Sequence, residues 1–135
     1  MKLKQTLLGT AAYTFVTFPI AILWHLVLFE ELYQSFNYIE GKPGFLLGFI
    51  SIFTQGFILS ALYPYVKFTG SPFIRGTKYA TLLGLFFWTS HVLAFLAKQA
   101  VDDALLFAAM ESFYLLLQFG FYGVLIGLIY KHDVD

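Results

Sequence analysis

Residues 86–98 read Phe-Phe-Trp-Thr-Ser-His-Val-Leu-Ala-Phe-Leu-Ala-Lys, and this stretch decides what kind of fold the chain adopts. It is apolar enough to lie in the hydrocarbon of a bilayer, yet it carries His91 well inside its ends. An ionisable side chain at such a depth is costly and is by default a candidate for function. The stretch therefore predicts both a membrane-spanning helix and a polar site within it.

The composition of the whole chain agrees with a membrane environment. Of its 135 residues, 59% are hydrophobic and 12% are charged, against roughly 25% charged in a soluble protein, and the mean hydropathy is +0.76. A chain of this length forms a single domain, residues 1–135. The formal net charge is zero, which argues against nucleic acid as a partner. The absence of cysteine excludes disulfides and thiolate metal sites.

Four apolar segments are each long enough to cross a bilayer, for which about 20 residues are needed. They are residues 6–29, 44–66, 79–97 and 104–130. None shows the alternation of polar and apolar residues that is typical of barrel strands. Because lipid offers no partners to the backbone, each segment should be a continuous helix. We therefore predict an all-α polytopic membrane protein, an antiparallel bundle of four transmembrane helices.

Local signals refine this bundle. Pro19 lies inside the first segment and predicts a kink there. Gly123 and Gly127 form a GxxxG motif, which predicts close approach of two helices. Residues 30–43 form the longest connection, and their interspersed apolar side chains predict an amphipathic turn at the membrane surface.

The distribution of basic residues predicts the orientation of the chain. One side of the membrane receives the larger basic set, and the opposite side receives only Lys42 and Lys98. The larger set comprises Lys2, Lys4, Lys67, Arg75, Lys78 and Lys131. By the positive-inside rule, both termini face the cytoplasm of a multi-pass cell-membrane protein.

Each predicted helix carries polar residues on one face, which in lipid is the face that meets other helices. Counting about 1.5 Å per residue, His25, His91 and Glu111 all fall in the outer half of the bilayer, on three different helices. Gln55 and Gln118 fall nearer the middle of the bilayer. We expect these side chains to meet inside the bundle.

Two imidazoles and one carboxylate suit a divalent metal such as zinc, iron or manganese. This hypothesis makes His25, His91 and Glu111 metal ligands. The same residues could instead hold a small ligand, and the further contacts would come from Gln55, Gln118, Tyr114 and Trp88. Bis-histidine haem fits less well, because Trp24 and Trp88 would crowd it. A di-iron centre is rejected because the Glu-x-x-His pairing is missing.

Other functions stay open beside a binding site. The histidines could each simply hydrogen-bond Gln55, Glu111 or a tyrosine and stabilise the bundle. The protein could be an accessory or scaffold subunit of a larger membrane complex, or a proton or ion transporter that acts as an oligomer. The sequence holds no Gly-rich phosphate loop, no GxSxG and no HExxH, so it indicates no enzyme class.

Several pieces of the chain resemble small four-helix bacterial membrane proteins that have no established activity. The pieces are Trp24-His25-Leu26-Val27-Leu28-Phe29, Thr54-Gln55-Gly56, Trp88-Thr89-Ser90-His91 and Met110-Glu111. The resemblance covers nearly the whole chain. It implies a four-helix fold and a bacterial inner membrane, and it transfers no mechanism.

Overall fold

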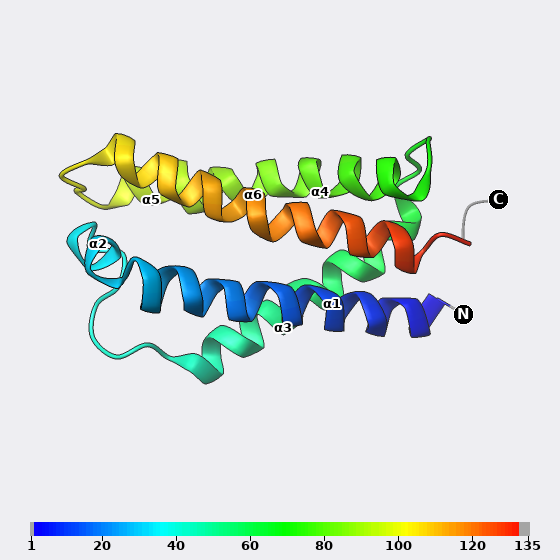
Figure 1. The fold of residues 1–135 in the computed structure, drawn as a ribbon, viewed down its shortest axis with the longest axis horizontal. Coiled ribbons are helices and arrows are strands. Elements are labelled where there is room, and N and C mark those ends of the chain that lie inside the picture. The colour runs from blue at the N-terminus through cyan, green and yellow to red at the C-terminus, as the bar shows by residue number, and fades with distance from the viewer. Residues whose placement is uncertain (1, 133–135) are drawn as a thin grey trace.

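The computed structural model describes residues 2–132, which fold into helices and the turns that join them (Figure 1). Four helical stretches are long and apolar enough to cross a membrane, namely Leu3–Leu28, Phe45–Tyr65, Pro72–Lys98 and Ala104–Ile129. The prediction of an all-α bundle with four transmembrane helices is confirmed. The chain is a multi-pass membrane protein.

Three of the four spans change their helical type near one end. The first is α1 (Lys2–Ile22) with the π-helix η1 (Leu23–Leu28), and the second is α3 (Phe45–Leu62) with the 3-10 turn η2 (Tyr63–Tyr65). The third is α4 (Pro72–Trp88), the π-helix η3 (Thr89–Leu93) and α5 (Ala94–Lys98), and the fourth is α6 (Ala104–Ile129). Helix α1 runs through Pro19 without ending, and the change of winding comes at Leu23.

The third span begins at Pro72, earlier than the start at residue 79 that hydropathy predicts. Ser71 caps the helix, because its side chain accepts a hydrogen bond from the backbone N–H of Ile74 at 3.4 Å. Pro72 suits the first turn, where its missing N–H would have had no partner. Arg75 and Lys78 therefore lie on α4 and not in a connection.

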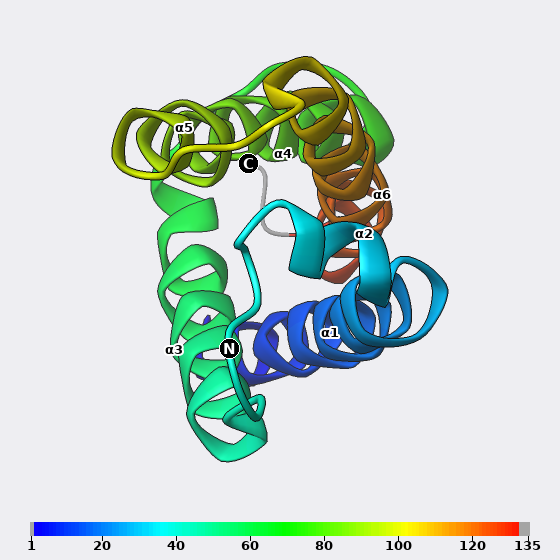
Figure 2. The same ribbon diagram turned by 90° about the vertical axis from the view of Figure 1, so that its left-hand side faces the viewer.

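The connection between the first two spans is more structured than an amphipathic turn. It contains a short helix, α2 (Glu30–Ser35). Tyr33 and Phe36 from this segment pack with Phe107 of α6, and all three are buried. Helix α2 thus folds back over one end of the bundle (Figure 2).

Seen from this end, the helices α1, α3, α4 and α6 surround a common interior (Figure 2). The most closely packed pairs are α4 with α6, α1 with α3, and α1 with α6. Helices α3 and α4 follow each other in the chain but are not such a pair. Figures 1 and 2 show that α3 starts well away from α5 and approaches α4 only at its end. The bundle is therefore least tightly closed between α3 and the third span.

Glycines bring α4 and α6 together, as the GxxxG motif predicts. A Cβ atom added to Gly76 would collide with the carbonyl oxygen of Gly123 and would lie 2.9 Å from the Cα of Gly127. A Cβ atom on Gly123 would lie 2.7 Å from that of Ala80. Only residues without a side chain permit this backbone approach.

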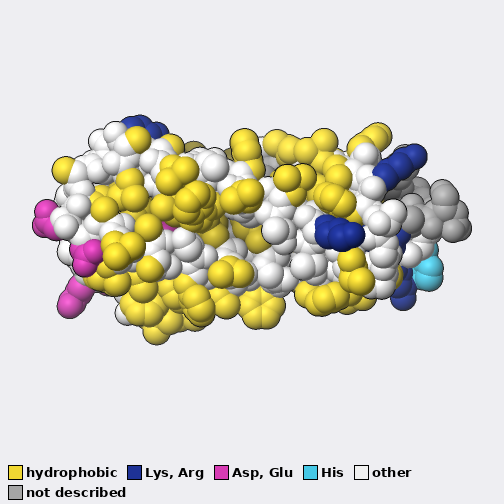
Figure 3. Space-filling model, turned by 90° about the horizontal axis from the view of Figure 1, so that it is seen from above, with side chains coloured by type: hydrophobic (Ala, Val, Ile, Leu, Met, Phe, Trp, Pro, Cys, Tyr) yellow, Lys and Arg dark blue, Asp and Glu magenta, His cyan; other side chains and the backbone are white. Residues whose placement is uncertain are grey.

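The interior contains many polar side chains among its apolar ones, whereas the outside is largely apolar, as a bilayer requires. Tyrosines, threonines, Gln118 and Glu111 are buried, whereas large hydrophobic side chains such as Phe15, Leu105 and Leu116 are exposed. Figure 3 shows apolar side chains around the middle of the molecule, most of the visible lysines and arginines near one end and the acidic side chains at the other. Water can therefore reach both ends, while lipid covers the middle.

Candidate functional site

The site is built around Glu111 of α6, whose side chain is fully buried. Its Oε2 accepts a hydrogen bond from the Tyr33 hydroxyl at 2.9 Å and lies 3.2 Å from Nε2 of His25. Its Oε1 lies 3.1 Å from Nδ1 of His91. The structure thus brings together His25, His91 and Glu111 from three different spans.

His25 uses both of its ring nitrogens. Nδ1 lies 3.0 Å from the carbonyl oxygen of Ala21 and must donate to it, because a carbonyl oxygen only accepts. The bond between Nε2 and Glu111 needs one further proton, located on either the imidazole or the carboxyl group. In both cases His25 and Glu111 share that proton, and the pair carries no net charge. This neutrality suits its depth in the membrane.

His91 has one nitrogen in use and one free. With a proton between His25 and Glu111, Oε1 of Glu111 is an acceptor, so Nδ1 of His91 carries the hydrogen and donates it. In the neutral imidazole, Nε2 of His91 then carries a lone pair. Within residues 2–132 it has no hydrogen-bond partner, and about 30% of this side chain is exposed.

Both histidines lie in π-helical segments, His25 in η1 and His91 in η3. In η1 the backbone N–H of Phe29 bonds the carbonyl of Trp24, five residues back, at 3.1 Å. The wider turn rotates a side chain relative to its position in an α-helix, and such segments are frequent at functional sites. Here the altered winding coincides with the two imidazoles that meet one carboxylate.

Tyr33 of α2 is the third hydrogen-bond partner of Glu111. Its own oxygen accepts a hydrogen bond from Nε1 of Trp24 at 2.9 Å, so its hydrogen is directed to Glu111. Burial and the nearby charge of Glu111 raise the pKa of the Tyr33 phenol well above its ordinary value. Tyr33 therefore remains a donor. Sequence reasoning missed this residue, and its nearest signal was the apolar pattern in residues 30–43.

Aromatic rings enclose His25. The centroids of Tyr33 and Tyr114 each lie 4.5 Å from the imidazole centroid in edge-on contacts, and the ring of Tyr38 stacks on it at 5.4 Å. Burial and the charge of Glu111 raise the pKa of Tyr38 far above its ordinary value. These rings leave about 10% of the His25 side chain exposed.

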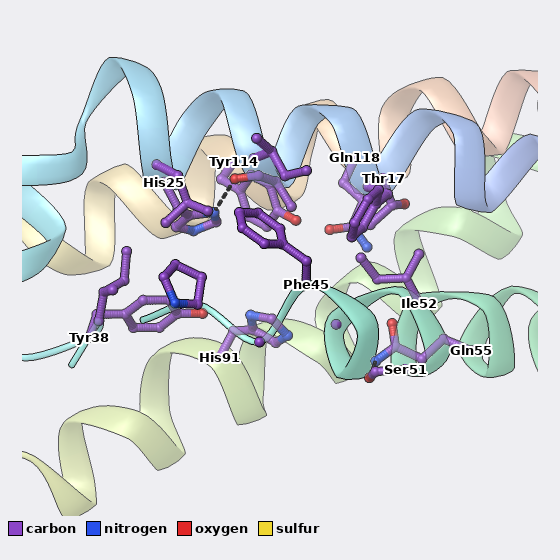
Figure 4. Close-up of a pocket in the computed structure, with 18 of the residues that line it drawn as sticks. Thr17, His25, Tyr38, Phe45, Ser51, Ile52, Gln55, His91, Tyr114 and Gln118 are labelled. Carbon is purple, nitrogen blue, oxygen red and sulfur yellow. Dashed lines mark hydrogen bonds between the residues drawn. The ribbon is translucent and has the colours of Figure 1, made fainter. Parts of the chain in front are cut away.

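A cavity of about 530 Å³ opens beside this cluster (Figure 4). His25, His91 and Tyr114 line it at one end, and residues of the first span and of α3 line it on opposite sides. The mouth is formed by residues 38–44. The cavity lies where the packing between α3 and the third span is open, so lipid and the end of the bundle that carries α2 are both close to it.

Several polar atoms in the cavity wall have no hydrogen-bond partner among the described residues. They include Nε2 of His91, Oε1 of Gln118 and the hydroxyls of Tyr114 and Thr17. Gln118 uses its other atom, Nε2, to donate to the Tyr13 hydroxyl at 2.7 Å. That hydroxyl donates in turn to Gln55 at 3.1 Å. The two predicted glutamines are thus joined through Tyr13, which the sequence did not single out.

Trp88 lies apart from this cavity. Its Nε1 donates to Ser112 at 2.8 Å, and it lines a separate hollow between α4 and α6. Of the predicted ligand-binding residues, Gln55, Gln118 and Tyr114 therefore lie at the cavity, and Trp88 does not.

The three predicted metal ligands contact one another through hydrogen bonds. Within residues 2–132, no group of three or more His, Asp or Glu side chains has an arrangement that could hold a metal ion. Compared with known proteins, the chain matches no family model, no curated protein sequence and no solved structure.

Proposed function

We propose that the cavity binds a small molecule that enters from the bilayer or from the outer surface. His91 and Tyr114 contact the ligand, while Glu111 and His25 position His91. The observation that carries the proposal is the state of His91. One nitrogen is fixed by a buried carboxylate at 3.1 Å, and the other has no partner beside a cavity of about 530 Å³.

A purely structural role for this cluster accounts less well for the arrangement. Polar side chains that only stabilise the helix packing should hydrogen-bond one another, because polar groups without partners are costly in an apolar medium. Here Nε2 of His91 and the Tyr114 hydroxyl lack partners among the described residues and line the same cavity, whereas Glu111 and His25 are fully bonded. Other buried atoms without a partner in this part of the chain, such as the hydroxyls of Thr14 and Tyr63, lie away from it. An apolar pocket with a few convergent polar groups is the usual form of a ligand site.

Filling the cavity tests the proposal. Gly48 lies at the cavity, and a Cβ atom added to it meets nothing within 4 Å. Gly48→Phe should therefore fill the cavity and leave the fold intact. Gly120→Phe is the matched control, because Gly120 has the same free space on α6 but lies outside this cavity.

The readout is native mass spectrometry of protein purified in mild detergent. Wild type and Gly120→Phe should retain a bound small molecule, and Gly48→Phe should lose it. Equal retention by both variants, or a wild type without any bound molecule, would contradict the proposal.

A bound zinc, iron or manganese ion is the second candidate. A histidine that ligates a metal commonly donates its other N–H to a carboxylate, as His91 does to Glu111. A metal held by His91 would need ligands beyond this cluster, such as water. Elemental analysis of the purified protein tests this candidate, and its absorption spectrum reports any haem. Metal in stoichiometric amount that disappears in His91→Phe would favour it.

We also propose that both termini face the cytoplasm. Lys67 and Lys131 belong to the end that carries the termini, while Glu30 and Asp102 belong to the opposite end. This asymmetry supports the orientation by the positive-inside rule. The resemblance to small bacterial proteins supports the inner membrane. A reporter fused to the C-terminus, active only in the cytoplasm, should be active.

A further inference from the structure

We infer that the ligand is an uncharged amphiphile whose polar head is a hydroxyl group, that is, a lipid alcohol. The inference rests on the proposed ligand site and names the class of molecule that the site would take. Its basis is the chemistry of the atoms left free in the cavity wall.

The free atoms match both functions of a hydroxyl group. In the neutral imidazole whose Nδ1 donates to Glu111, Nε2 of His91 offers a lone pair and accepts. The hydroxyl of Tyr114 can donate. One alcohol group would donate its hydrogen to His91 and accept a hydrogen bond from Tyr114. An ether oxygen could make only the second of these bonds.

The charges around the cavity disfavour a charged head group. A carboxylate would face the lone pair of His91. An ammonium group would seek a carboxylate, but Glu111 is fully buried and already bonded by three side chains. The acidic and basic residues that line the cavity, Glu40 and Lys42, belong to its exposed mouth. An uncharged head group is thus the one that the inner end can hold without an unpaired charge.

The remainder of the wall suits a hydrocarbon chain. Apolar side chains line the cavity from three elements, namely Phe18, Ile22 and Leu26 of the first span, Phe45 and Ile52 of α3, and Ile39 of the connection. The weak packing between α3 and the third span gives such a chain a lateral route from the bilayer. The polar end of the cavity and its apolar walls together describe an amphiphile.

Photolabelling in phosphatidylcholine nanodiscs tests this inference. Three probes share one chain with a diazirine in its middle: dodecan-1-ol, its methyl ether and dodecanoic acid. Labelled cavity residues are located and quantified by mass spectrometry. The alcohol should label wild type about fivefold more than the ether, the factor expected for one net hydrogen bond. This ratio should fall towards one in His91→Phe and in Tyr114→Phe.

Tyr114→Phe keeps the test informative if His91→Phe does not fold, because the Tyr114 hydroxyl has no partner to lose. Equal labelling by alcohol and ether, with labelling lost in Gly48→Phe, would overturn the hydroxyl class and leave the ligand site standing. Stronger labelling by the acid would also overturn the class. Cavity labelling that is the same in Gly48→Phe and Gly120→Phe would overturn the ligand site itself.

Discussion

Glu111 is the side chain on which the polar cluster depends, since it is hydrogen-bonded to His25, His91 and Tyr33. Glu111→Gln places an amide among these donors and removes the charge that the shared proton balances. At least one buried bond is then lost, so we expect a loss of about 1–3 kcal/mol in the free energy of unfolding. Thermal unfolding in detergent, followed by circular dichroism, measures it. Glu30→Gln, an exposed change on α2, is the control, and equal stability of the two variants would contradict the prediction.

Tyr33 supports the same carboxylate from outside the spans. Tyr33→Phe removes the donor to Glu111 and leaves Nε1 of Trp24 without an acceptor. We expect it to lower the free energy of unfolding by about 1–2 kcal/mol. Tyr114→Phe is the matched control and should be close to neutral. If both changes cost the same, the bond from Tyr33 to Glu111 contributes nothing to stability.

Tyr33 also predicts a response to alkaline pH. Burial raises its pKa above the ordinary value of 10.0, so above that pH the folded protein keeps a proton that the unfolded chain releases. The folded state then binds more protons, and stability falls as pH rises. Tyr33→Phe should make the decline shallower, measured as the melting temperature between about pH 8 and pH 11. An unchanged slope would contradict this origin of the alkaline response.

At the scale of elements, the contact between α4 and α6 depends on the absence of side chains. Gly76→Ala would force a methyl group against the carbonyl of Gly123, and we expect overpacking to cost about 1–3 kcal/mol. Gly120→Ala, on the same helix pair but in open space, should be neutral or stabilising by up to about 1 kcal/mol. Chemical denaturation in mixed micelles compares them. Equal effects would mean that the two backbones do not touch.

The spans could be predicted from sequence wherever a local signal marks the boundary. Helix α6 begins at the predicted residue 104, where Asp103 caps it by accepting a hydrogen bond from Leu106 N–H at 2.9 Å. The start of α4 was misjudged because Arg75 and Lys78 resemble loop residues by hydropathy, although Ser71-Pro72 is a helix start.

Contacts between distant segments explain what the sequence could not predict. Helix α2 is short, and burial of Tyr33 against Phe107 of α6 stabilises it. The π-helical winding around His25 and His91 coincides with bonds to Glu111, which lies on a third element. Depth in the membrane sufficed to group these three residues. Which nitrogen of His91 stays free depends on the bond geometry alone.

In the molecule as a whole, polar side chains are buried in the bundle and apolar side chains cover its surface. The packing is weakest between α3 and the third span. Most of the visible basic side chains lie near one end and the acidic ones at the other, where the cavity opens. A ligand therefore does not have to pass the basic end, which carries the termini, to reach the cavity. The cavity therefore communicates with one side of the membrane and with the lipid that faces α3. This arrangement fits the proposed ligand site better than a continuous pore.

The loosely closed side can be tested by labelling, because the chain has no cysteine of its own. Ser51 is exposed and lines the cavity, whereas Ser60 is fully buried on the same helix, so Ser51→Cys and Ser60→Cys form a matched pair. Methyl methanethiosulfonate should modify the first within minutes and leave the second intact, as mass spectrometry of the whole protein would show. Gly48→Phe in the Ser51→Cys background should slow the modification, since the new ring fills the space beside the thiol. If Ser51→Cys were as protected from modification as Ser60→Cys, α3 would pack against the third span along its full length, and the lateral route would then be absent.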